Sequence, residues 1–277
     1  MTVSIIIPTY NNKNDLEKTI HSIINQSVDT SNIEVIICDD GSSDSTKAMC
    51  LKFQNMINIR YLYQEDQGFR AAKARNMGLE AAQGEFILFI DSGVLIKSDL
   101  IETHLSNYDD ATINIGFCHG FDEHSVMNND FESHIAMNQF DTLFMNLLND
   151  ENNRDCRFKL LTHIGHFRGF EQYPWLFFWG GHLFGKKEHF LQVGGFDEKF
   201  THWGGEDVEL GLRLHLSGIK MSLNLDAHAY HIPHKKADTA SKESTVNNCF
   251  YIHNKHQLDI THTMTQKTWE EIVAEVD

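Results

Sequence analysis

The chain has 277 residues, which is enough for one large domain or two closely packed ones and too many for a bare binding module. Asp and Glu outnumber Lys and Arg by 39 to 23, which gives a formal net charge of −16. This balance argues against a sequence-independent nucleic-acid binder, because such a protein must neutralise phosphates with Lys and Arg. Apolar residues make up 41% and charged residues 22%, so the chain is globular rather than disordered.

The segments that could direct the chain elsewhere are absent from the sequence. The five cysteines are scattered and form no CxxC pair, which favours reduced thiols over a disulfide framework. The first residues, MTVSIIIPTYNN, lack the basic flank of a signal peptide, so we expect a first strand there. No apolar stretch approaches the roughly 20 residues that a transmembrane segment needs. These features predict a soluble protein in the cytoplasm.

The first hundred residues alternate between apolar runs and helical spacing. A continuous apolar run is typical of a strand that is covered on both faces. Strands are predicted over residues 3–7, 33–38, 59–63 and 85–90, and helices over residues 14–24, 44–53 and 70–82. This order indicates βαβ units and a mostly parallel, doubly wound sheet flanked by helices.

The second half is less regular. Helical patches are predicted over residues 140–148 and 158–164, and an amphipathic helix over residues 206–216 ends just before Gly218. The Phe-rich stretches 167–170 and 175–184 are predicted to lie in the core. Residues 236–277 are predicted to be a polar tail in which residues 265–276 could form one helix. Most of the 17 histidines are expected at the surface.

Polar, turn-forming residues follow three of the predicted strands, at residues 8–11, 39–42 and 91–93. In doubly wound sheets, ligands bind beyond the carboxyl ends of the strands. A strand must also end in a turn, and Asp, Gly and Ser are turn residues, so each loop alone has a structural explanation. Three such loops at one sheet edge favour a ligand site.

Four segments carry a resemblance to a known family: IIIPTYNN (5–12), EVIICDDGSSDST (34–46), QGFRAAKARNMGLEAAQGEFILFID (67–91) and GGFDEKF followed by WGGEDVEL (194–210). In this order they resemble the GT-A glycosyltransferases, a large inverting family of the family 2 type. The last segment is similar to the galactosyl- and N-acetylgalactosaminyltransferase branch. The resemblance covers roughly residues 1–110 and 178–235.

The resemblance implies a Rossmann-like α/β fold of the GT-A type with a mostly parallel central sheet and a smaller acceptor-binding part. Residues 1–110 would form the nucleotide-sugar-binding half, and residues 111–235 the acceptor-binding and catalytic half. Residues 236–277 would be a C-terminal tail that packs on the domain or extends from it.

The resemblance assigns the base and ribose of the donor to the residues Pro8, Thr9, Tyr10 and Asn11 and to the carboxylate of Asp40. A carboxylate can accept hydrogen bonds from the N3–H group of uracil or from ribose hydroxyls. The neighbouring Asp39 has a turn or capping role as its alternative.

Three basic residues lie within one and a half helical turns, although the chain is acidic overall: Arg70, Lys73 and Arg75. Arg can clamp phosphate oxygens with two parallel hydrogen bonds, so this group is expected to bind the diphosphate of the donor. A solvated helix face is the alternative, above all for Lys73. Asn76 could add a hydrogen bond to the donor.

The sequence departs from the family pattern at Asp91-Ser92-Gly93. The family usually has Asp-x-Asp here, and the second carboxylate binds the cation that bridges the diphosphate. Asp91 and Ser92 remain donor-binding candidates, but one carboxylate makes a poor Mn²⁺ or Mg²⁺ site. The family position adds His231 as a second metal-ligand candidate. The alternatives are a cation held by phosphates and water alone, or Arg and Lys in place of a cation.

Glu206 and Asp207 follow a Gly-Gly turn and open a predicted helix. Compensation of the helix dipole is the structural explanation for two carboxylates there. The resemblance implies that Asp207 is the general base and that Glu206 orients the acceptor, with Trp203 and Gly205 lining the acceptor site. Trp203 suits stacking on a sugar, although a core tryptophan would explain it equally well.

The function expected from the resemblance is inverting transfer of a sugar from a UDP-sugar to an acceptor hydroxyl. The acceptor would be a saccharide, a peptide or a small molecule, and no nucleic acid is expected as a partner. One alternative is a nucleotide-sugar-binding protein with impaired catalysis, since the Asp-x-Asp pattern is broken. A weaker alternative is a nucleotidyltransferase.

Overall fold

The computed structural model describes residues 2–106, 108–120, 140–149, 154–158, 168–233 and 242–276. The strands are β1 (Val3–Thr9), β2 (Ile33–Asp39), β3 (Asn58–Tyr63), β4 (Phe86–Ile90), β5 (Val94–Ile96), β6 (Thr112–His119), β7 (His182–Lys186) and β8 (Lys220–His231). The longer helices are α1 (Lys13–Ile24), α3 (Ala71–Ala81), α6 (Phe140–Asn149), α10 (Glu206–Leu216), α11 (Lys242–His256) and α13 (Trp269–Val276). The shorter ones are α2 (Thr46–Leu51), α4 (Leu100–Ser106), α8 (Arg168–Gln172), α9 (Lys187–Gln192), α12 (Asp259–Thr263) and the 3₁₀ helices η1 (Thr30–Asn32) and η3 (Pro174–Phe177).

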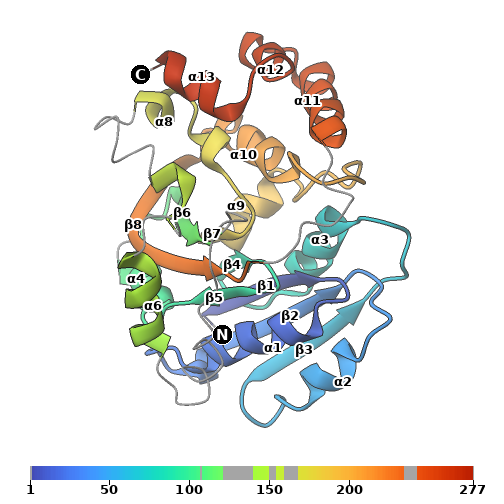
Figure 1. Ribbon diagram of the computed structural model, residues 1–277, viewed down its shortest axis with the longest axis vertical. Helices are drawn as coiled ribbons and strands as arrows, with labels where there is room; N and C mark the ends of the chain where they lie inside the picture. Colours follow the sequence, from blue (N-terminus) through green and yellow to red (C-terminus); the bar gives the residue numbers. More distant parts are fainter. Residues whose placement is uncertain are drawn as a thin grey trace.

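The strands form one sheet in the order β3-β2-β1-β4-β7-β6-β8-β5, with helices on its faces (Figure 1). The pairs β1–β2, β2–β3, β1–β4 and β6–β8 are parallel, whereas β7 runs antiparallel to both β4 and β6, and β5 runs antiparallel to β8. This arrangement confirms the predicted α/β class with a mostly parallel sheet. The sheet continues through both of the halves that were expected from the sequence.

The continuous apolar run of β1 is explained by burial on both faces. Ile6 joins a buried cluster with Leu79 of α3, whereas Ile5 and Ile7 join a second cluster with Ile20 of α1. Successive strand residues point to opposite faces, so both faces of β1 need apolar side chains when helices cover both. The same pattern gave the strand prediction, which ends two residues short of the observed Thr9.

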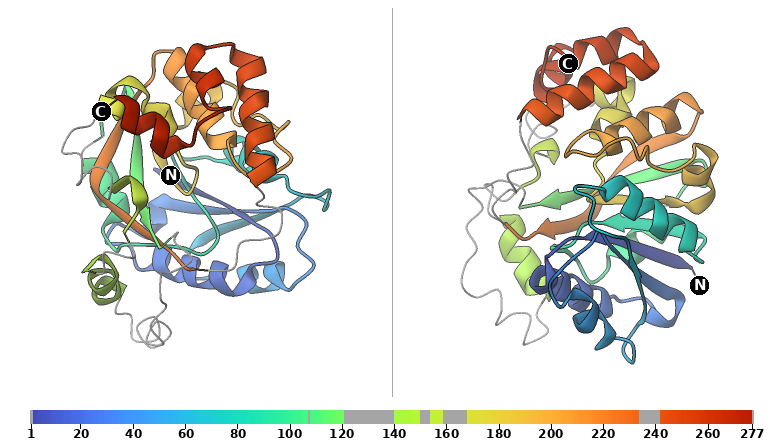
Figure 2. Two further views of the ribbon diagram at one scale, coloured as in Figure 1. Left: turned by 45° about the horizontal axis from the view of Figure 1, so that its top comes forward. Right: turned by 90° about the vertical axis from the view of Figure 1, so that its right-hand side faces the viewer.

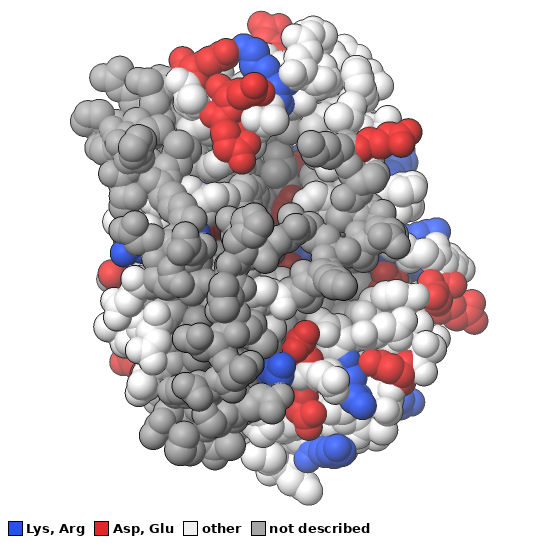
Figure 3. Space-filling view, viewed as in Figure 1, with Lys and Arg blue, Asp and Glu red and all other residues white. Residues whose placement is uncertain are grey.

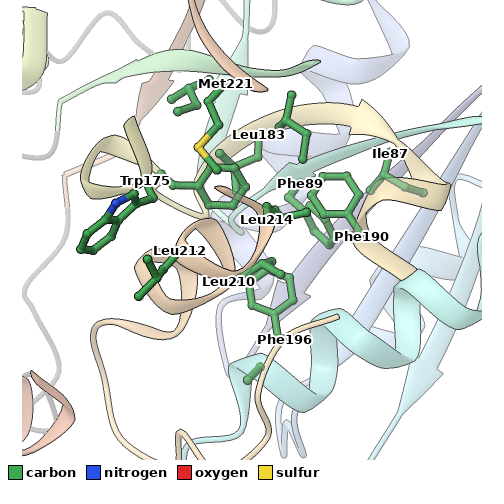
Figure 4. Packing of buried hydrophobic residues seen from close by; sticks show 14 of the residues in the cluster. Ile87, Phe89, Trp175, Leu183, Phe190, Phe196, Leu210, Leu212, Leu214 and Met221 are labelled. Atoms are coloured by element: carbon green, nitrogen blue, oxygen red, sulfur yellow. The ribbon is translucent and has the colours of Figure 1, made fainter. Parts of the chain in front are cut away.

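The helix α10 is fixed against the sheet by apolar packing, and it spans the predicted residues 206–216. Its Leu210 and Leu214 lie among the aromatic side chains of Phe89 and Phe190 (Figure 4). An added Cβ at Gly211 would lie 2.7 Å from Phe178, so the missing side chain allows the close approach of α10 to that segment. The predicted core role of the 175–184 stretch is confirmed, because Trp175, Phe177, Phe178 and Phe184 are buried.

The prediction of a polar tail after residue 235 is wrong in one respect. Residues 242–276 form the three helices α11, α12 and α13, which gather with α10 at one end of the molecule (Figure 2). Ile252, Ile272 and Val273 are buried in the same cluster as Leu210, so these helices pack on the domain. Only α13 was predicted. The predicted patch 140–148 is helical, whereas most of the patch 158–164 lies outside the described residues.

Four buried histidines contradict the expectation that nearly all of the histidines lie at the surface: His104, His119, His182 and His189. The Nε2 atoms of His104 and His182 are 2.9 Å apart, and His182 Nδ1 donates to the carbonyl oxygen of Phe117 over 3.1 Å. Burial lowers the pKa of His182 to about 3, so this ring is neutral and can accept the second hydrogen bond.

The charged surface fits the exclusion of a polyanion binder. On the face shown in Figure 3, the described Lys and Arg side chains are interspersed with Asp and Glu, and acidic side chains gather over α13. Among the described helices, none combines the length and apolar character that a bilayer crossing needs.

Candidate active site

The three loops that follow the predicted strands meet at one sheet edge. The Asp40 N–H group donates to the carbonyl oxygen of Thr9 over 2.9 Å, and Thr9 Oγ1 lies 3.4 Å from Ser92 Oγ. These contacts join the ends of β1, β2 and β4, because the parallel pairing of these strands places their carboxyl ends side by side. The sequence predicted this meeting.

Asp40 is held at the bottom of this edge and is 6% exposed. Its carboxylate accepts hydrogen bonds from Gln64 Nε2 over 2.6 Å and from the backbone N–H group of Arg70 over 2.7 Å. Burial raises the pKa of Asp40, and these two donors oppose the rise. A carboxylate has about four acceptor positions, so Asp40 retains capacity for a ligand.

The loop after β1 has one exposed side chain and one that stabilises the neighbouring loop. Tyr10 is 51% exposed, and its hydroxyl donates to Asp66 over 3.0 Å. The side-chain oxygen of Asn11 accepts hydrogen bonds from the Ser43 N–H group over 2.8 Å and from the Asp44 N–H group over 3.3 Å. Tyr10 can therefore face a ligand, whereas the Asn11 side chain shapes the site. Pro8 is half-buried within β1.

Arg75 links the donor edge to the helix α10. Its Nη2 lies 2.8 Å from Asp91 Oδ1, and its Nη1 lies 3.1 Å from Glu206 Oε1. Arg75 is 5% exposed, and its guanidinium lies 5.3 Å from the ring centre of Phe196. This ion-paired group brings together carboxylates that are far apart in the sequence.

The predicted cluster of three basic residues is therefore not a single clamp. Lys73 is exposed and Arg70 is half-buried, whereas Arg75 is buried between two carboxylates. The Asn76 amide donates to the Phe196 carbonyl oxygen over 2.9 Å and to Glu198 over 3.0 Å, and it accepts from the Phe196 N–H group over 2.7 Å. These contacts hold the turn at 196–198, and binding of the donor by Asn76 stays a prediction.

Glu206 and Asp207 lie at the N-terminus of α10, directly after Gly205, whose φ of 90° places it in the left-handed region. Asp207 accepts hydrogen bonds from the Gly180 N–H group and from its own neighbour Val208, each over 2.8 Å. Burial raises the pKa of Glu206 to about 7, with the charge of Asp207 acting in the same direction and Arg75 against it.

Burial also raises the pKa of Asp207, while the Gly180 N–H group and Arg75 oppose the rise. Two neighbouring carboxyl groups with raised pKa values can exchange a proton near neutral pH, as acid–base catalysis requires. Dipole compensation alone would not require their burial beside Asp91.

Trp203 is 46% exposed, so the alternative of a core tryptophan is wrong. The residue lies two positions before Gly205, on the same turn that leads into α10. An exposed indole at this place is suited to stacking on a sugar ring.

The donor set does not fit a divalent cation site. Asp91 Oδ1 is paired with Arg75, and Gly93 offers no side chain where the family pattern has a second carboxylate. The Ile232 N–H group donates to the Gly93 carbonyl oxygen over 2.9 Å, which brings the end of β8, and with it the buried His231, beside this turn. Across the described ranges, no three His, Cys, Asp or Glu side chains form a candidate ligand group.

The sequence did not single out several groups that complete the site. The Gly180 N–H group supports Asp207, Gln64 supports Asp40, and Phe196 covers Arg75. The Gly-Gly pair at residues 180–181 was the one available signal, since glycine allows a close approach of backbone. An added Cβ at Gly180 would lie 3.3 Å from the Arg75 guanidinium.

Comparison with known proteins adds two family models. The model described as glycosyl transferase family 2 matches residues 4–174. A model described as the N-terminal domain of galactosyltransferase matches residues 166–235, which contain the WGGEDVEL segment. Validoxylamine A glucosyltransferase of Streptomyces hygroscopicus subsp. jinggangensis is 32% identical over 259 residues, which cover 92% of this chain and 61% of that protein. The chain thus spans about three fifths of the length of this curated relative.

Solved structures share the fold over nearly the whole chain. S. aureus TarS residues 1–349 in complex with UDP-GlcNAc matches with a TM-score of 0.67 and 18% identity, covering 100% of this chain and 71% of that one. The mannosyltransferase PcManGT of Pyrobaculum calidifontis, in complex with GDP-Man and Mn²⁺, matches with a TM-score of 0.62 and 16% identity, covering 99% and 72%. The fold is that of the GT-A glycosyltransferases, and with the first family model matching more than half of its residues, the chain belongs to glycosyltransferase family 2.

Proposed function

We propose that the chain transfers a sugar from a UDP-sugar to a hydroxyl group of an acceptor, with inversion at the anomeric carbon. The observation that carries this proposal is the Arg75 bridge, which joins Asp91 at the donor edge to Glu206 beside Asp207. A transferase needs its donor site and its base on either side of one reacting carbon, and the bridge brings these two elements together.

The donor half of the proposal comprises residues 1–110. The end of β1 and the Asp40 carboxylate would take the nucleoside, with Tyr10 exposed beside it. Arg70 and Lys73 would approach the diphosphate, while Ser92 and Asp91 would lie near the ribose and the sugar. A UDP-sugar is favoured because TarS, which shares the fold, was solved with UDP-GlcNAc.

The acceptor half comprises residues 111–235. The acceptor hydroxyl attacks the anomeric carbon from the face opposite UDP, and Asp207 takes the hydroxyl proton. The carbon–oxygen bond to UDP breaks, and its electron pair leaves with the β-phosphate oxygen. General-base assistance of this kind contributes about 10²–10⁴ in rate. The raised pKa of Asp207 makes it a stronger base than an ordinary aspartate.

The remaining acceptor residues orient the reacting hydroxyl. Glu206 is held by Arg75 beside Asp207 and can bind the acceptor, while Trp203 offers its exposed ring to a sugar face. Gly205 keeps the backbone open at this place. A saccharide, a peptide or a small molecule could fill this side. No step passes through a cation, because the side chains present do not fit one.

The proposal is tested by incubating the protein with a panel of UDP-sugars and candidate acceptors, followed by assays of released UDP. The anomeric configuration of the product, measured by NMR, reports inversion or retention. Thermal stabilisation by UDP without turnover of any donor would favour a nucleotide-sugar-binding protein that has lost catalysis. Consumption of a sugar 1-phosphate together with UTP would instead favour a nucleotidyltransferase.

A further inference from the structure

The helix α11 lies beyond both family models, which end by residue 235, yet it contacts the turn that leads into the catalytic helix. We propose that Asn248 of α11 is a positioning residue for the transfer reaction. Its side-chain amide fixes the turn at residues 202–205, which presents Trp203 and leads into Glu206 and Asp207. The inference rests on the proposed function only for its kinetic consequence.

The turn is intrinsically flexible. Gly204 and Gly205 have φ values of 97° and 90°, a conformation that residues with side chains rarely adopt. Glycine also loses the most conformational freedom when it is ordered, so two adjacent glycines need outside contacts to hold one conformation. The side chain of Gly205, as the N-cap of α10, can offer no capping hydrogen bond.

Asn248 supplies these contacts. Its Nδ2 atom lies 2.6 Å from the carbonyl oxygen of Gly204, 3.2 Å from that of Trp203 and 3.4 Å from that of His202. An amide nitrogen carries two hydrogens, so Gly204 takes one and the two weaker acceptors share the other. One side chain thereby fixes the direction of three successive carbonyl groups.

The helix that carries Asn248 is firmly attached to α10 at its other end. The buried carboxylate of Glu209 lies 2.7 Å from Lys255 Nζ and 2.9 Å from His256 Nε2, and it is paired with Arg213 over 2.8 Å. The eight residues from Asn248 to His256 span about 12 Å of helix. Because α11 is anchored there, Asn248 acts from a fixed support.

Apolar contact closes the space between the two helices. Ile252, one turn after Asn248, is fully buried, and its Cδ1 would lie 3.4 Å from a Cβ added to Gly205. The turn thus lies against α11 on one side, while Trp203 remains exposed on the other. Movement of the turn would change the direction of the Trp203 ring and the place of the first residues of α10.

The test compares two adjacent asparagines of α11. Asn248→Asp places a carboxylate against three carbonyl oxygens, and Asn248→Ala removes the donor without adding charge. Asn247→Asp and Asn247→Ala make the same changes at an exposed neighbour. Hydrogen exchange measured by mass spectrometry should rise about tenfold over residues 202–208 in both Asn248 variants, the loss expected for about 1.4 kcal/mol of hydrogen bonding. It should stay unchanged over β1 and β4, and everywhere in the Asn247 variants.

Exchange needs no turnover, so it tests the inference even if the proposed transfer is never observed. An unchanged exchange rate over residues 202–208 would overturn the inference, as would an equal rise throughout the chain. Given a transfer assay, the Asn248 variants should raise the KM for the acceptor and lower kcat, while the Kd for UDP stays within twofold. A proportional loss of UDP binding would instead show a general structural role and would also overturn it.

Discussion

Replacement of the Arg75 guanidinium tests the bridge between the two halves of the site. In Arg75→Met, the apolar stem can still pack on Phe196, but Asp91 and Glu206 lose their shared cation. The contact with Glu206 is dry, since the two side chains are 6% and 8% exposed, whereas Asp91 is 31% exposed and partly screened by water. The cost therefore arises chiefly at Glu206.

Removal of one partner from a buried ion pair destabilises a protein by about 3–5 kcal/mol. The lower end applies here, because Asp91 is partly solvated. At about 2–4 °C per kcal/mol for a chain of this size, the melting temperature should fall by about 10 °C. Loss of the cation also raises the pKa of Glu206 and Asp207 in the folded state, so the variant takes up protons more readily than the parent.

The sign of the pH dependence follows from this uptake. Because the folded variant binds more protons than the folded parent, the difference in unfolding free energy grows as pH rises through the Glu206 pKa of about 7. Thermal melts at pH 5.5 and pH 8.5 measure both effects, with Lys73→Met as the control that removes an exposed charge from the same helix. A melting temperature within about 2 °C of the parent at both pH values would refute the reasoning.

Two further predictions concern the acid–base pair and the cation. In Glu206→Gln, loss of the neighbouring negative charge lowers the pKa of Asp207, so the acidic limb of the kcat/KM profile moves to lower pH; a shift to higher pH would contradict the assignment of the base. Since Gly93 removes a ligand, transfer should survive EDTA or need unusually high Mn²⁺, as an activity titration can measure. Complete inactivation by EDTA with rescue by low Mn²⁺ would mean that other groups build a normal cation site.

Local patterns were sufficient to predict the donor edge. The apolar runs that form β1, β2 and β4 are each followed by turn residues, and the parallel connection brings those turns together. The contact of Asp40 with the segment around Arg70 follows from this topology. The WGGEDVEL segment likewise predicted the bounds of α10, because its apolar residues repeat at helical spacing.

Long-range pairing could not be predicted in the same way. Arg75 and Glu206 are 131 residues apart, and the sequence shows Arg75 only as part of a basic run. His104 and His182 are 78 residues apart, and each becomes a core residue only because the other satisfies its ring nitrogen. The helix α11 is polar around most of its surface, so its register against α10, set by Glu209 and Ile252, left no clear pattern in the sequence.

The central claim is that Asp207 takes the proton of the acceptor, and Asp207→Asn tests it most directly. The new amide can still accept the Gly180 N–H bond but cannot serve as a base at neutral pH. With the melting temperature and the Kd for UDP used as controls for folding and donor binding, transfer should fall by about 10²–10⁴. Near-parental transfer by a folded variant that binds UDP normally would contradict the claim.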